Sequence, residues 1–219
     1  MIVLEINGEQ KRIPQSYSEI TLGDFTKLWK IMCKYNLDEP ETDDDVERKV
    51  VNELNLSREL VGAMLGLKSE DVDKLDVQQT DEVIGLFNRL LEKDELDGDW
   101  GNHKFEHNGE EFYFPQHNFG EMSFGEYATI KQYEQVLSKD NGNRFDFIAE
   151  QIAYCCRKKG EEKESYDLKE RADLFRDVTM DKVLKLTFFL QKRISSLEAI
   201  TKMYSEAAKI QSEKKLVTS

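Results

Sequence analysis

The sequence is poor in cysteine, proline and histidine, and it has no long hydrophobic run. Its 219 residues include 3 cysteines, 3 prolines, 3 histidines and 12 glycines. The most apolar late stretch, residues 183–190, is interrupted by Lys185 and is far shorter than the ~20 residues of a membrane-spanning helix. The first residues show neither the basic start nor the apolar stretch of a secretory signal peptide. We therefore expect an intracellular protein that does not span a membrane.

Recognisable catalytic chemistry is also lacking. The sequence has no G-x-S-x-G, P-loop, G-x-G-x-x-G or H-E-x-x-H pattern. Its three cysteines are Cys33 and the adjacent pair Cys155 and Cys156. Neighbouring residues on a helix point about 100° apart, so the pair is expected to be reduced and to pack on an apolar helix face. These features favour a protein without enzymatic activity or a cofactor.

Negative charge is abundant and unevenly divided. The net charge is −13; residues 1–100 carry 24 acidic and 12 basic side chains, whereas residues 101–219 carry 20 and 19. This acidity speaks against nucleic-acid binding, because phosphates are bound by Lys and Arg, and it favours a basic partner for the first half. Residues 38–47 contain seven acids. We expect a solvated loop there, with an electrostatic docking patch as the alternative.

The sequence contains an internal duplication. Residues 7–15 match residues 108–116 at an offset of 101, and residues 19–25 match 121–127 at an offset of 102. A later match aligns residues 80–86 with 180–186 at an offset of 100. Two separate regions match at nearly the same offset. This predicts two tandem repeats, residues 1–99 and 100–193, followed by a C-terminal arm and tail over 194–219.

Each repeat is predicted to begin with a β-hairpin. Asn-Gly after an alternating apolar run is a strong signal for a two-residue type I′ turn, since both central residues need positive φ. A proline then ends the return strand, and a Ser or Thr stands where a helix N-cap belongs. The residues in these roles are Asn7, Gly8, Pro14 and Thr21 in the first repeat and Asn108, Gly109, Pro115 and Ser123 in the second.

Helical periodicity follows in both repeats, which predicts an α+β, mainly α-helical protein in which each hairpin precedes a helical bundle. In the first repeat we expect helices over residues 24–35 and 80–93, with two short helices within 46–65. In the second repeat we expect helices over 126–138 and 144–158, an exposed loop over 159–169, and a short helix beginning at Arg171.

A long C-terminal helix is the main asymmetry between the repeats. From Asp181 onward about thirty residues lack Gly and Pro and could form a rod of about 45 Å. Two apolar seams run along its later part, and they predict either packing on the protein's own core or binding to another chain, a second copy or a virion protein. The candidate partner-binding residues are Ile194, Leu197, Ile200, Met203, Tyr204 and Ile210.

One weak alternative is a metal site. His103 and His107 lie four residues apart, and on a strand they share one face. A small metal-dependent hydrolase using this pair is the less favoured hypothesis. We expect exposed hairpin histidines instead.

The helix-opening sequences of residues 20–25 and 122–127, and the stretch 170–183 leading into Phe188 and Phe189, resemble small assembly proteins of tailed bacteriophages. That group includes tail assembly chaperones and baseplate-hub assembly factors. The resemblance implies a non-enzymatic protein that acts in tail or baseplate assembly through contacts with other phage proteins or with itself. It would act in the host cytoplasm or reside in the virion. The alternative is a permanent virion component, such as a neck, ring or packaged protein.

Overall fold

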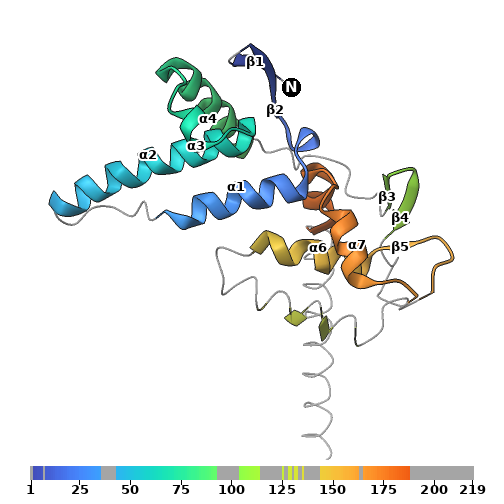
Figure 1. The fold of residues 1–219 in the computed structure, drawn as a ribbon. Helices are drawn as coiled ribbons and strands as arrows, with labels where there is room; N and C mark the ends of the chain where they lie inside the picture. Colours follow the sequence, from blue (N-terminus) through green and yellow to red (C-terminus); the bar gives the residue numbers. More distant parts are fainter. Residues whose placement is uncertain are drawn as a thin grey trace, which may run out of the picture.

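The protein is a mainly helical α+β structure with two small antiparallel sheets, as the sequence predicts (Figure 1). The computed structural model describes residues 2–6, 8–35, 43–92, 104–113, 144–162 and 165–187, and six single positions between 125 and 135. Both predicted repeat boundaries lie outside these ranges. So do Asn7, Pro115, Ser123, His103 and the six candidate partner-binding residues of the C-terminal arm. Along the described chain, no helix combines the length and the apolar character needed to cross a membrane.

Both predicted hairpins are present. Strand β1 (Ile2–Ile6) pairs with β2 (Glu9–Ile13), and β3 (Lys104–His107) pairs with β4 (Glu110–Tyr113). Asn108 and Gly109 have φ angles of 52° and 75°, the positive values that a type I′ turn requires. Gly8 has φ 78° at the matching turn.

The second hairpin carries a strand that the sequence did not predict. Helix α6 (Arg144–Cys155) ends before residue 158, and β5 (Arg157–Lys158) pairs with β4 to give the order β3-β4-β5. The prediction of a helix through residue 158 was therefore wrong. A two-residue strand leaves no alternation to detect, and only the neighbouring edge of β4 makes the extended conformation favourable.

The first helix begins where its cap predicts. Helix α1 (Leu22–Lys34) is capped by Thr21, whose hydroxyl oxygen accepts a hydrogen bond from the Asp24 amide at 3.1 Å. The same hydroxyl donates to the Asp24 carboxylate at 3.0 Å. This exchange satisfies one of the free amides that every helix start leaves.

The middle of the first half differs from expectation in three respects. Helix α2 (Asp43–Leu65) is one continuous helix instead of two short ones, and it begins inside the acidic run that was expected to be a loop. Short helix α3 (Ser69–Val72) follows. Helix α4 (Val77–Glu92) starts three residues before the predicted Thr80, because the Asp76 carboxylate accepts a hydrogen bond from the Gln79 amide at 2.7 Å.

In the second half, α7 (Leu168–Phe175) also starts earlier than predicted. Asp167 caps it by accepting a hydrogen bond from the Glu170 amide at 2.9 Å. The expected exposed loop is therefore shorter, and Glu161 within it is mostly buried against Arg171. A last helix occupies residues 180–187 of the described chain.

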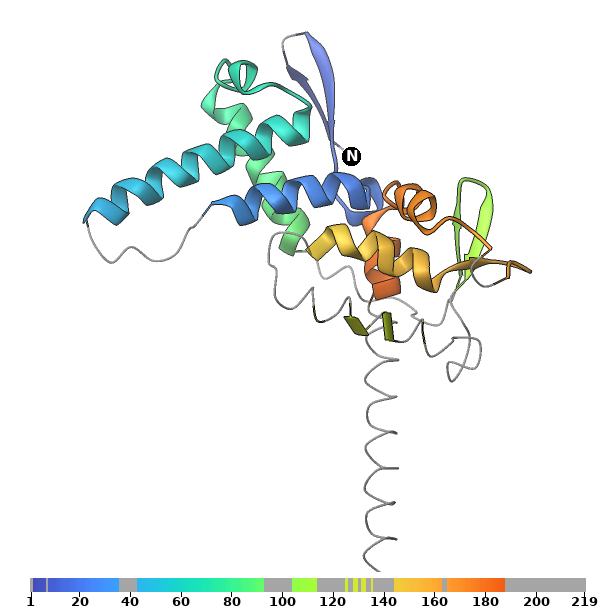
Figure 2. The same cartoon turned by 60° about the horizontal axis from the view of Figure 1, so that its bottom comes forward.

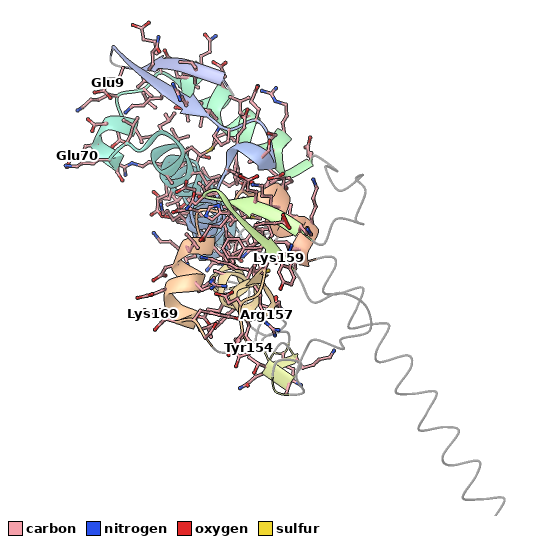
Figure 3. All side chains as sticks on the ribbon, turned by 90° about the vertical axis from the view of Figure 1, so that its right-hand side faces the viewer. Glu9, Glu70, Tyr154, Arg157, Lys159 and Lys169 are labelled. Carbon is pink, nitrogen blue, oxygen red and sulfur yellow. The ribbon has the colours of Figure 1, made fainter. Side chains whose placement is uncertain are left out.

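One hydrophobic core joins the two halves. The larger cluster of buried side chains contains Phe25 and Phe87 from the first half and Phe145 and Phe175 from the second. Figures 1 and 2 show α1 lying beside α6, and the rings of Phe25 and Phe145 meet edge to face with centroids 4.9 Å apart. A smaller cluster packs the first hairpin on α2, α3 and α4.

Backbone hydrogen bonds also connect the halves, at the starts of two helices. The Leu22 amide donates to the Val178 carbonyl at 2.8 Å, and the Met180 amide donates to the Ile20 carbonyl at 2.9 Å. These bonds flank an antiparallel bridge between Thr21 and Thr179. The amides at each helix start are thereby satisfied by the other half of the molecule.

Candidate protein-binding surface

The most unusual surface feature is an exposed apolar row on the first half of α2. Val46, Val50, Val51 and Leu54 are 47–66% exposed. At 3.6 residues per turn they fall within an arc of about 140° on one side of the helix. We call these four residues the α2 stripe.

The opposite side of the first half of α2 is less exposed than the stripe. Asp45, Lys49, Asn52 and Leu56 are all half-buried there. Helix α1 contacts α2 at Glu59, in its second half. A surface helix normally turns its apolar side inward and its charged side outward. In the first half of α2 four apolar side chains are turned to solvent, next to the exposed Glu47, Arg48 and Glu53.

The stripe continues the buried face of the same helix. Val61 and Leu65, in the second half of α2, lie at the same helical angle as the stripe and are buried against the first hairpin and α4. The hairpin and α4 cover only this second half. Figures 1 and 2 show the beginning of α2 extending past the end of α1.

Polar contacts join the end of α1 to the second half of α2. Near the end of α1, Lys34 donates to the Glu59 carboxylate of α2 at 2.5 Å, and the Tyr35 hydroxyl donates to the same carboxylate at 2.7 Å. These hydrogen bonds hold the pKa of Glu59 below its usual value. These contacts join α1 to the second half of α2, and the stripe lies on the part of α2 that precedes them.

Of the two histidines considered for metal binding, only His107 lies in the described part of the chain. His107 is buried, and its Nε2 lies 3.2 Å from the Leu174 carbonyl oxygen of α7. The expectation of an exposed histidine was wrong, because α7 packs over the hairpin. Within the described ranges, no group of His, Cys, Asp and Glu side chains is placed to hold a metal ion.

The cysteine pair packs as predicted. Cys155 and Cys156 are buried, and no disulfide involves them or Cys33, all three being in the described part of the chain. Burial raises the pKa of the Cys156 thiol well above its usual value, which disfavours the thiolate that nucleophilic chemistry needs.

A second surface feature is a hollow of about 400 Å³ between β2, the start of α1 and the end of α2. The sequence pattern predicted neither this hollow nor the α2 stripe. The apolar spacing within 46–65 was evident, but it is the same in the covered and uncovered halves of α2. Comparisons of the chain with protein-family models, curated proteins and solved structures found no match.

Proposed function

We propose that this protein is a non-enzymatic protein-binding factor that acts in the assembly of a tailed-bacteriophage virion, at the tail or baseplate. The observation that supports the proposal is the α2 stripe. It continues the apolar face that Val61 and Leu65 bury in the core, but it is exposed to solvent. Contiguous exposed apolar patches usually mark protein-interaction sites, because leaving them in water is unfavourable.

The proposal includes a basic amphipathic helix as the partner element. Acidic residues Glu47 and Glu53 lie beside the stripe and are exposed, and the first half of the chain carries most of the net negative charge. An apolar ridge with cationic flanks would match this surface in both shape and charge. Such a helix belongs to another phage protein or to the C-terminal arm of a second copy.

We also propose the tandem-repeat architecture as the origin of the fold. Two Asn-Gly hairpins stand in the same register, and each precedes a similar series of helices: α2, α3 and α4 in one half, and α6, α7 and residues 180–187 in the other. The predicted C-terminal arm, residues 194–219, follows the second repeat and has no counterpart after the first.

The test uses a phage whose copy of this gene is deleted and complemented from a plasmid. The double variant Val50→Asp, Leu54→Asp should lower the yield of complete particles at least tenfold, because two charges on the stripe would be desolvated on binding. The matched control is Val77→Asp on α4, where a valine is 77% exposed but stands outside the stripe.

Both variants should keep the wild-type unfolding free energy within about 0.5 kcal/mol, because the changed side chains are exposed. Electron microscopy of the deletion lysate should show incomplete tails or baseplates. Normal particles in that lysate would refute the proposed function, and full yield with the stripe variant would refute the assignment of the stripe. Mass spectrometry of purified particles separates an assembly factor that leaves from a permanent component that stays.

A further inference from the structure

The two hairpins differ at one edge. In the second hairpin, β5 covers the outer edge of β4, where Tyr113 pairs with Arg157 and Phe112 pairs with Lys158. In the first hairpin, β2 pairs only with β1 within the described chain. The outer edge of β2 is therefore open where its counterpart is filled.

The register shows which backbone groups are left open. A two-residue turn makes Ile6 and Glu9 a hydrogen-bonded pair, and such pairs alternate along an antiparallel ladder. The backbone N–H and C=O groups of Gln10 and Arg12 consequently point away from β1. No hydrogen bond joins them to any other described residue. Arg12 matches Tyr113 in the repeat register, and Tyr113 is the residue that pairs with β5.

The length of the connection after α2 explains why the first half leaves the outer edge of β2 open. Between α6 and α7 the connection spans residues 156–167, long enough to include a strand. Between α2 and α3 it spans only residues 66–68. The Leu67 amide in this short connection already donates to the Gly62 carbonyl at 2.9 Å to close the end of α2. The first repeat has no segment there that could supply the missing strand.

The hollow of about 400 Å³ lies beside this edge. Arg12 and Pro14 line it from β2, Leu28 from α1, and Met64 and Leu65 from α2. Charged groups around it are paired, since Lys27 bonds to Asp24 at 2.8 Å and Glu19 accepts from the Gln15 amide at 2.9 Å. Arg12 has no charged partner among the described residues. An open strand edge beside a hollow is the arrangement that binds an extended peptide, with backbone bonds for affinity and the hollow for a side chain.

We propose that the open edge of β2 binds an extended segment of a partner protein, antiparallel to β2, with an acidic residue opposite Arg12. The acidic residue follows from the free guanidinium, which would repel a basic strand such as β5. This surface is separate from the α2 stripe, and the inference rests on the proposed function only in requiring a protein partner.

The probe is a synthetic peptide copied from residues 153–162 of this chain, with both cysteines changed to serine and Arg157→Glu. The unaltered Arg157 version is the charge-matched control. Titration into the ¹⁵N-labelled protein should shift the amide signals of Gln10 and Arg12 and slow their hydrogen exchange. The glutamate peptide should bind at least tenfold more tightly than the arginine peptide, and Arg12→Glu should reverse that preference.

Two proline variants test whether the peptide binds at the outer edge of β2. Arg12→Pro removes an outward amide without removing a bond to β1, and it should weaken peptide binding at least tenfold. Val3→Pro is the control, because Val3 is the residue paired with Arg12 and its amide lies on the opposite edge of the same hairpin. Slow hydrogen exchange of the Ile13 amide, measured in each variant, verifies that the first hairpin remains folded.

Failure of both peptides to bind the wild-type protein would overturn the proposal, as would equal binding to the Arg12→Pro variant. Sedimentation that depends on concentration and is abolished by Arg12→Pro would also overturn it, by assigning the edge to a second copy. These outcomes leave the stripe experiment unaffected. If complementation shows no role in assembly while the peptide still binds, the proposed function fails and this inference stands.

Discussion

At the scale of single residues, Arg171 is a buried charged side chain held by several contacts. Its side chain is only 6% exposed and makes a bidentate pair with Glu161, with N–O distances of 3.0 and 2.5 Å. The guanidinium also stacks on the Tyr166 ring, 3.9 Å from its centroid, and lies 5.4 Å from the Phe112 ring centroid. This contact ties the connection after β5 to α7 and to the second hairpin.

Removal of the Glu161 carboxylate should reveal the free-energy cost of burying the Arg171 charge without a partner. Glu161→Ala leaves the Arg171 cation buried and unpaired, and we expect a loss of about 3 kcal/mol in unfolding free energy. The double variant Glu161→Leu, Arg171→Met removes both charges and should recover most of that loss. Urea denaturation measures all three proteins. A double variant as unstable as the single one would show that the pair stabilises the fold through more than charge balance.

Glu161 also predicts a pH dependence. Partial burial raises its pKa, but hydrogen bonds from Arg171 and from the Lys158 amide outweigh this effect and hold the pKa below its ordinary value of 4.5. A carboxylate with a lowered folded-state pKa stabilises the protein above the unfolded-state value and loses that contribution as pH falls through the folded-state value. Unfolding free energy should therefore decrease below about pH 4.5. The decrease should be smaller in Glu161→Gln, and an identical pH profile would contradict this assignment.

At the scale of elements, the end of α2 depends on a residue in the left-handed conformation. Gly66 has φ 65° and follows the last helical residue, while the amide of Leu67 closes the helix on the Gly62 carbonyl. This is the usual way in which glycine terminates a helix. The short turn that results brings α3 back toward the first hairpin.

The same substitution at two glycines should therefore have opposite effects. Gly66→Ala should lower the unfolding free energy by about 1 kcal/mol, because a side chain is strained at positive φ. Gly85→Ala should raise it by about 0.5 to 1 kcal/mol, because Gly85 is inside α4 and nothing lies within 4 Å of an added Cβ. Thermal or urea unfolding of the two variants measures both signs. Equal effects would show that Gly66 is not restricted to its left-handed conformation.

At the scale of the whole molecule, the two halves share one core. Trp29 of α1 contacts Phe145 of α6 with ring centroids 5.1 Å apart, and the backbone bonds around Thr21 and Thr179 join the halves directly. Each half alone would leave part of this apolar surface in water. The shared core implies cooperative unfolding of the described chain.

We expect a single unfolding transition in urea. In a Trp100→Phe background, Trp29 is the one remaining tryptophan, and its fluorescence reports on the junction between the halves. The midpoint followed by fluorescence should coincide with the midpoint followed by far-ultraviolet circular dichroism. Two separate midpoints would show that the halves unfold independently.

What the sequence determined by itself was local. Asn-Gly turns specified both hairpins, because the positive φ angles of Gly8, Asn108 and Gly109 and the alternation beside the turns involve only neighbouring residues. The Thr21 cap located the start of α1 for the same reason. The mainly helical composition followed from helical spacing and from the scarcity of proline and glycine.

The tertiary structure decided which apolar faces are covered by other parts of the protein. Val50 and Val61 belong to one apolar face of α2, yet Val50 is 49% exposed and Val61 is fully buried, because the first hairpin and α4 reach only the second half of the helix. The burial of His107 and the formation of β5 likewise depend on α7 and on the edge of β4. Periodicity states which side of an element is apolar. Whether water or protein meets that side depends on segments distant in sequence, and their arrangement is a property of the folded chain.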